Sequence, residues 1–169
     1  MRRIRNFVEL TTDIGTTGQP ALEQFANIAR NGYEVVINLA MPDQQDSIES
    51  EGSVVTSLCM SHVHIPVRFD STKPNRVRQC CELMDTLQGS KIFVHCSMND
   101  RVSVFLFHYV SKVRGLSEDE SRSPIFHSWT PEEQRERLIS LSKRELGLYP
   151  LSSMGRLVAS YAPKRGRIK

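Results

Sequence analysis

One stretch, residues 91–114, constrains the fold more than any other part of the chain. It begins with a hydrophobic, strand-like segment, 91–94, continues through a short polar loop, and ends in a helical segment, 102–114, that is apolar nearly all round. A helix without a polar face must lie in the middle of a domain, with other elements around it. A strand that leads into such a helix is typical of an α/β fold.

The chain before residue 115 repeats this alternation of strands and helices. Apolar spacing and turn residues predict helices over 20–32, 48–58 and 74–89, and strands over 34–39, 62–67 and 91–96. Pro66 indicates that the second of these strands is an edge strand or ends there. The sequence therefore predicts an α/β fold with a central, mostly parallel sheet flanked by helices.

Beyond Gly115 the patterns are helical only, which predicts a helical C-terminal half. Two segments, 117–120 and 130–133, match the capping box, in which a hydroxyl and a glutamate bond each other's backbone N–H groups. The second box begins an amphipathic helix that we predict over 130–146. Residues 162–169 are expected to be disordered.

Length and composition predict one globular domain over residues 1–169, with flexible basic ends at 1–10 and 162–169. The chain has 169 residues, of which 39% are hydrophobic and 24% charged. It lacks an apolar run near the ~18 residues that span a bilayer, and it lacks a signal peptide. We therefore expect a cytoplasmic location and no membrane contact. The net charge of +3 comes without a nucleic-acid-binding motif, so a nucleic-acid partner is not expected.

The four cysteines show no paired spacing typical of metal ligands, so neither a metal nor another cofactor is expected. Cys59, Cys80 and Cys81 are interpreted as small core or surface residues. Cys96 differs from them because it ends a strand and begins a polar loop.

The surroundings of Cys96 suit a reactive thiolate. Ligands of open α/β sheets bind at the carboxyl ends of the strands, which is where Cys96 is expected. The following helix N-terminus and Arg101 favour negative charge, and the backbone N–H groups of the loop can bind an oxyanion. We predict that Cys96 and Arg101 are catalytic. The residues expected to bind substrate are Ser97, Met98, Asn99, Asp100, Val102 and Ser103.

Four side chains around the loop carry more specific expectations. The loop has no glycine, so Asn99 is predicted to adopt the positive φ that a tight turn requires. Ser103 is expected to donate a hydrogen bond to the sulfur. Asp100 should face outward, because its carboxylate would repel an anion. His95 is expected to support the loop through hydrogen bonds to backbone carbonyls.

The His95-Cys96 segment resembles the signature of the cysteine-dependent protein tyrosine phosphatases, His-Cys-x5-Arg-Ser/Thr. The wider chain is similar to small bacterial dual-specificity-like phosphatases over 11–129, in segments 17–20, 35–39, 64–67 and 94–105. The resemblance implies thiolate attack on a phosphate monoester, protonation of the leaving group by an aspartate, and hydrolysis of the cysteinyl phosphate. It implies a phosphorylated protein or a small phosphomonoester as substrate.

The general acid of that family lies on the loop after the strand that ends here at 64–67, and Asp70 occupies this place. A loop carboxylic acid beside a dry pocket suits leaving-group protonation. Asp70 is equally well explained as a solvated residue that caps the next helix. Asp46 and Asp13 are the weaker candidates for the acid.

The chain departs from the family signature at the arginine. Four residues, not five, separate Cys96 from Arg101, and Val102 stands where the arginine is expected. Either the loop is one residue tighter and Arg101 still reaches the anion, or Arg101 points elsewhere and phosphate binding is weak. Rhodanese-like sulfurtransferases have a loop of this shorter length, so sulfur transfer is one alternative function. A phosphatase-fold module that binds a phosphorylated partner without catalysis is the other.

Overall fold

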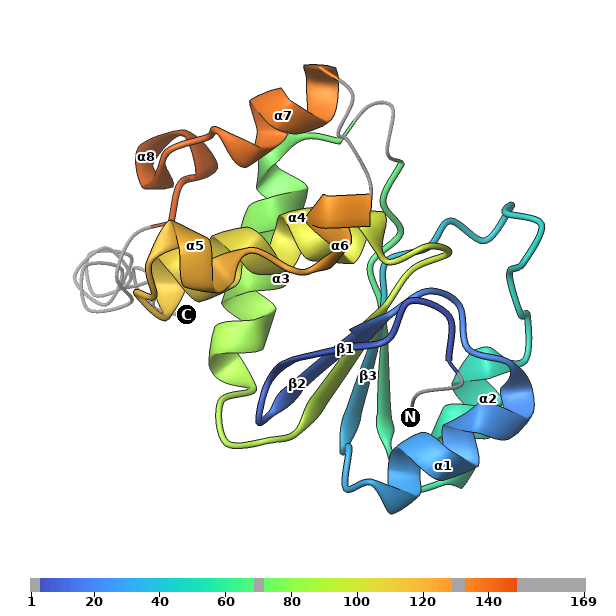
Figure 1. The fold of residues 1–169 in the computed structure, drawn as a ribbon. Helices are drawn as coiled ribbons and strands as arrows, with labels where there is room; N and C mark the ends of the chain where they lie inside the picture. Colours follow the sequence, from blue (N-terminus) through green and yellow to red (C-terminus); the bar gives the residue numbers. More distant parts are fainter. Residues whose placement is uncertain (1–3, 69–71, 129–132, 149–169) are drawn as a thin grey trace, which may run out of the picture.

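The computed structural model describes residues 4–68, 72–128 and 133–148, and a five-stranded sheet forms its centre (Figure 1). The strand order is β1-β2-β5-β3-β4. The strands are β1 (Val8–Thr11), β2 (Ile14–Thr17), β3 (Val35–Asn38), β4 (Ser61–His64) and β5 (Ile92–His95). Only the β1–β2 pair is antiparallel among the pairs of this sheet. The predicted mostly parallel sheet is confirmed, with β4 as the predicted edge strand.

Helices cover both faces of the sheet. The short helix η1 (Leu22–Gln24), α1 (Phe25–Arg30) and α2 (Glu51–Ser57) lie on one side in Figure 1. The other side carries α3 (Pro74–Thr86), α4 (Asp100–His108), the π-helical turn η2 (Tyr109–Val113), α5 (Glu118–Ser121), α6 (Ile125–Ser128), α7 (Glu133–Ile139) and α8 (Lys143–Leu146). The predicted flanking helices and helical C-terminal half are therefore confirmed.

The sheet separates two hydrophobic cores. Successive side chains of a strand point to opposite faces, so Val36 and Phe93 belong to the core beneath α1 and α2. Ile37 and Val94 belong to the larger core beneath α3 and α4. All α4 residues after the first, Asp100, are buried, as the apolar sequence of this helix predicts.

The β1–β2 hairpin is absent from the sequence-based prediction. β1 is only half-buried, and β2 has one large apolar residue, Ile14, followed by Gly15 and two threonines, so neither strand shows a clear hydrophobic pattern. Gly15 is needed because a Cβ there would lie 2.3 Å from the hydroxyl oxygen of Tyr33. This ring packs edge-on against Phe93, 5.2 Å between centroids.

Residues 4–10 are part of the fold, which differs from the flexible end expected over 1–10. Ile4 is buried in the smaller core, and β1 begins at Val8. The remaining parts of the expected flexible ends, 1–3 and 162–169, lie outside the described residues.

The helix predicted over 130–146 is wrong as a single element. The described part contains two short helices, α7 and α8. Ser142 starts the second one, because its hydroxyl accepts the Glu145 N–H while the Glu145 carboxylate accepts the Ser142 N–H. This capping box begins a new helix. The box at 117–120 is confirmed in α5, and the one predicted at 130–133 extends outside the described residues.

An ion pair joins the β1–β2 turn to the end of η2, at the amino-terminal edge of the parallel strands. The Arg114 guanidinium contacts both carboxylate oxygens of Asp13, with Nη1 3.0 Å from Oδ1. The hydrogen bond from Arg114 lowers the pKa of Asp13 to about 2, from 3.8. The ion pair therefore holds Asp13 ionised and fixes the turn.

Acidification is expected to weaken this ion pair between about pH 4 and pH 2. A carboxyl group with a lowered pKa in the folded state stabilises the fold above its unfolded-state pKa, and this stability is lost as the pH falls through the folded-state value. About a third of Asp13 is exposed, so we expect a contribution of only about 1 kcal/mol. Urea unfolding of Asp13→Asn should show this deficit at pH 6 and not at pH 2.

Candidate active site

Cys96 directly follows β5, at the carboxyl end of a strand that lies between β2 and β3. Its side chain is 1% exposed. The Cys96 N–H donates a hydrogen bond to the carbonyl oxygen of Thr17, 3.3 Å away, at the end of β2. The cysteine thus lies at the central carboxyl edge of the sheet, as the sequence predicts.

The loop after Cys96 turns sharply at Asn99, whose φ is +74°, so the predicted positive φ is confirmed. The Asn99 amide is buried and donates hydrogen bonds to the backbone oxygen of Asn6 at 2.8 Å and to Thr16 Oγ1 at 3.1 Å. α4 begins at the next residue, two residues earlier than predicted. The first N–H groups of a helix have no partner within it and favour an anion.

Residues near the N-terminus clamp this loop from the outside. The Gln19 N–H donates to the Ser97 carbonyl oxygen at 3.0 Å, and Asn6 Nδ2 donates to the Met98 carbonyl oxygen at 2.9 Å. A Cβ on Gly18 would lie 2.6 Å from the Ser97 oxygen, so only glycine permits this close approach. Two segments far from Cys96 in sequence therefore hold its loop.

The Arg101 side chain, 7% exposed, returns to the same edge of the sheet. Nη1 lies 3.3 Å from the carbonyl oxygens of both Leu39 and Val67, which follow β3 and β4. Nη2 donates to Oε1 of Gln44 at 2.7 Å, and this oxygen also accepts a hydrogen bond from Ser97 Oγ at 2.8 Å. One oxygen atom therefore joins the guanidinium to the residue after Cys96, despite the shorter spacing.

Two expected side-chain contacts are wrong. Ser103 Oγ donates to the carbonyl oxygen of Asn99 at 2.8 Å, because a hydroxyl in a helix reaches the carbonyl four residues earlier. His95 does not support the loop through backbone carbonyls, since its Nε2 lies 2.9 Å from a carboxylate oxygen of Glu51. The Val102 side chain belongs to the larger core, which leaves only its backbone for a ligand. Asp100 is half-buried at the start of α4.

Glu51, the first residue of α2, is the centre of a buried polar network beneath Cys96. Its Oε1 lies 2.9 Å from His95 Nε2, 3.0 Å from His62 Nε2 and 2.9 Å from Asn38 Nδ2. Its Oε2 accepts a hydrogen bond from Gln19 Nε2 at 2.7 Å. One carboxylate therefore joins side chains from four other segments.

The charge of Glu51 is maintained by this network. Burial alone would raise the pKa of Glu51, but the hydrogen bonds from His62 and His95 outweigh burial and hold it well below its usual range. His95 Nδ1 has no hydrogen-bond partner among the described residues. Its contact with Glu51 is therefore what orients the imidazole next to Cys96.

The three aspartates considered as general acid differ in position. Asp46 lies at the site, because its Oδ1 is 3.0 Å from Ser97 Oγ. Asp13 lies at the opposite edge of the sheet, where it pairs with Arg114. Asp70 lies outside the described residues.

Local sequence patterns do not indicate four residues that contact the site: Gln44, Glu51, Asn6 and Arg5. Gln44 and Glu51 come from the segment after β3, and the other two precede β1. Their contacts with the Cys96 loop span 44 or more positions of sequence. Local spacing carries no signal for such contacts.

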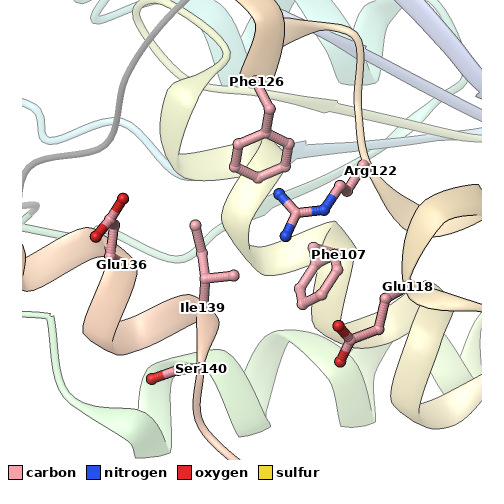
Figure 2. A pocket seen from close by; sticks show the side chains of 7 residues that line it. All are labelled: Phe107, Glu118, Arg122, Phe126, Glu136, Ile139 and Ser140. Atoms are coloured by element: carbon pink, nitrogen blue, oxygen red, sulfur yellow. The ribbon is translucent and has the colours of Figure 1, made fainter.

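A separate pocket of about 350 Å³ lies among the C-terminal helices (Figure 2). Its lining includes Phe107, near the end of α4 that is far from the Cys96 loop. The Arg122 guanidinium contacts the rings of both Phe107 and Phe126. Two carboxylates, Glu118 and Glu136, also line the pocket and would repel a phosphate group. This pocket is therefore distinct from the Cys96 site.

Two further features concern metals and membranes. In residues 4–68, 72–128 and 133–148, no group of His, Cys, Asp and Glu side chains is arranged to hold a metal ion. Across the same part of the chain, every helix is too short or too polar to span a bilayer.

Comparison with known proteins gives related sequences and related folds. No protein-family model matches the chain. It is 24% identical over 125 residues to the beta-lactamase hydrolase-like protein of Xylella fastidiosa, known from strains Temecula1 and 9a5c. The match covers 72% of this chain but 28% of that protein, so the chain spans less than a third of these relatives.

Solved structures match over most of the chain. A DUF442 protein from Shewanella putrefaciens CN-32, described as a candidate phosphatase, has a TM-score of 0.74 and 26% identity. The match covers 82% of this chain and 91% of that chain. The core catalytic domain of the PP-IP phosphatase SIW14 from S. cerevisiae has a TM-score of 0.70 and 14% identity, over 90% of this chain and 94% of that chain. At 14% identity, the match to SIW14 shows a shared fold and nothing further.

The resemblance predicted from the His95-Cys96 segment is thus confirmed by folds that match nearly the whole chain. The strand-loop-helix unit around Cys96 lies within the same fold. The chain therefore shares the fold of these phosphatase structures, and its His95-Cys96 segment resembles the cysteine-dependent phosphatase signature.

Proposed function

We propose that this chain hydrolyses phosphate monoesters through a cysteinyl-phosphate intermediate, with Cys96 as nucleophile and Arg101 as phosphate ligand. One observation carries the proposal: Cys96, the Arg101 guanidinium and the N-terminus of α4 meet at the carboxyl edge of the sheet. A cation and a helix N-terminus beside a buried thiol stabilise negative charge on an attacking sulfur and on phosphoryl oxygens.

The reaction has two steps. The Cys96 sulfur attacks phosphorus, the bond from phosphorus to the leaving oxygen breaks, and a carboxylic acid gives its proton to that oxygen. Water then attacks the cysteinyl phosphate, which releases orthophosphate and regenerates the thiol. Arg101 and the loop residues 97–103 would bind the phosphoryl oxygens, chiefly through backbone N–H groups.

In this structure the Gln44 amide oxygen accepts the hydrogen bonds that Arg101 and Ser97 would otherwise donate to a phosphate. Phosphate binding through these side chains therefore requires the Gln44 amide to move. Its Oε1 accepts hydrogen bonds from both side chains, as a phosphoryl oxygen would. A neutral amide oxygen is a weaker partner for a guanidinium than a charged phosphate, so the exchange is favourable.

The substrate we propose is a phosphorylated protein or a small phosphomonoester, of the phosphotyrosine or dual-specificity type. The fold likeness to the PP-IP phosphatase SIW14 supports the second class equally well. All four cysteines are free thiols, which supports the expected cytoplasmic location.

Hydrolysis of p-nitrophenyl phosphate by the purified chain tests the proposal. We expect turnover and a covalent phosphoenzyme that is trapped by rapid quenching. Binding of a phosphotyrosine peptide without turnover would instead indicate a non-catalytic binding module. Cyanide-dependent formation of thiocyanate from thiosulfate, without phosphate release, would indicate a sulfurtransferase.

Asp70→Asn is expected to slow turnover about 100-fold for alkyl phosphates and only slightly for p-nitrophenyl phosphate. Alkoxide leaving groups have a high pKa and need a proton, whereas p-nitrophenolate leaves without one. The measurement is kcat against leaving-group pKa. Asp46→Asn is the matched variant, since Asp46 lies at the site. If Asp46→Asn shows the steeper dependence, Asp46 and not Asp70 is the acid.

A further inference from the structure

The segment before β1 brings a second arginine to the Cys96 site. The backbone oxygen of Arg5 accepts hydrogen bonds from Thr17 Oγ1 at 2.7 Å and from the Gly18 N–H at 2.8 Å. Thr17 ends β2, and its own carbonyl oxygen accepts the Cys96 N–H. The backbone of Arg5 is therefore attached to the sheet edge that carries the proposed nucleophile.

The Arg5 side chain is directed toward the loop. Its stem lies over Gly18, where a Cβ would come within 3.1 Å of Arg5 Cδ. Its Nη1 lies 3.4 Å from Met98 Sδ and 3.8 Å from Asp46 Oδ2. Met98 belongs to the Cys96 loop, and Asp46 contacts Ser97 of the same loop. The guanidinium therefore lies at the rim of the site.

The partners of this guanidinium are weak. A thioether sulfur is a poor acceptor, and the distance to Asp46 is long for an ion pair. The Arg5 side chain is 56% exposed, and exposed ion pairs contribute little. Arg101, in contrast, is buried and its guanidinium donates to three oxygen atoms. The Arg5 charge is thus available to an incoming anion.

We propose that Arg5 determines specificity by binding a second anionic group next to the phosphate held at Cys96. The inference rests on the proposed function, because Arg101 and the loop bind the first phosphate. A buried cation at the base and an exposed cation at the rim fit a substrate with two neighbouring anionic groups. Such substrates are preferred over monoesters whose remaining part is neutral.

Calorimetric binding of orthophosphate and pyrophosphate to the Cys96→Ser chain tests this role without catalysis. Pyrophosphate offers two linked phosphate groups, and we expect it to bind about fivefold more tightly than orthophosphate, as one additional exposed charge contact allows. Arg5→Gln should reduce this ratio to about one. Arg5→Lys keeps the charge and should keep most of the preference.

Arg30→Gln is the matched control, because it removes the same charge from an exposed arginine. Arg30 ends α1, just before the amino-terminal end of β3, whereas Cys96 lies at the carboxyl edge of the sheet. Arg30→Gln should leave the ratio unchanged. If Arg5→Gln keeps the pyrophosphate preference, or if both variants lower it equally, the inference is wrong. If the unmodified chain hydrolyses p-nitrophenyl phosphate but Arg5→Gln keeps the pyrophosphate preference, the role of Arg5 is wrong and the proposed hydrolysis stands. An Arg5-dependent preference without turnover contradicts the proposed hydrolysis alone.

Discussion

Cys96→Ser is expected to reduce hydrolysis of p-nitrophenyl phosphate by more than about 10³-fold, the order of loss that follows removal of an enzyme nucleophile. A serine hydroxyl in this position has no general base to activate it and cannot form the cysteinyl phosphate. Cys96 is 1% exposed and bordered by the ordered loop, so a change of one atom should leave the fold intact. Initial rates and thermal unfolding of the variant check both statements.

Cys59→Ser is the matched control for this loss. Cys59 is exposed and far from β5 in sequence, and its replacement should leave the rate within about twofold of the original. Cys80 and Cys81 do not compete as nucleophiles, because burial raises the pKa of Cys80 to about 12 and also raises that of Cys81. If Cys96→Ser keeps its activity, another residue is the nucleophile and the proposed mechanism is wrong.

The position of Cys96 could be predicted from sequence because it depends on local patterns. A buried strand, a polar loop and an apolar helix follow one another directly, so the cysteine has to lie at a carboxyl edge. The positive φ of Asn99 follows equally from local chemistry, because the loop contains no glycine and asparagine best tolerates that conformation.

The support of the site could not be predicted, because it depends on contacts between distant segments. Nothing around Glu51 distinguishes it from Glu49, which is exposed two residues earlier on the same approach to α2. Its role appears only when four segments converge on one carboxylate. The clamp formed by Asn6 and Gln19 on the loop depends in the same way on the β1–β2 hairpin, whose short strands carry little hydrophobic pattern.

The convergence on Glu51 also links stability to the proposed chemistry. His95 is fully buried, directly precedes Cys96, and has Glu51 as its side-chain hydrogen-bond partner. His62 shares the same carboxylate oxygen and is the more exposed of the two histidines. A change at Glu51 therefore alters the orientation of the imidazole beside the nucleophile as well as the packing around α2.

Glu51→Ala is expected to lower the free energy of unfolding by about 3–5 kcal/mol, the cost of removing one partner from a buried charged network. The substitution leaves buried donors on Asn38 and His95 without their carboxylate acceptor. Glu51→Gln keeps the shape and one acceptor oxygen, so its cost should be about half as large. Urea unfolding at pH 7 measures both variants.

Glu49→Ala provides the comparison, because it removes an exposed carboxylate of the same segment and should cost less than about 0.5 kcal/mol. Equal effects of the two alanine variants would show that the Glu51 network contributes no specific stability. Glu51→Gln is also made in a Cys59→Ser background, and the alkylation of Cys96 by iodoacetamide is measured on the folded protein. We expect slower alkylation than with Glu51 present, because His95 no longer contacts a charged carboxylate that orients it. Unchanged alkylation together with a stability loss would limit Glu51 to a purely structural role and separate the packing of α2 from the positioning of Cys96.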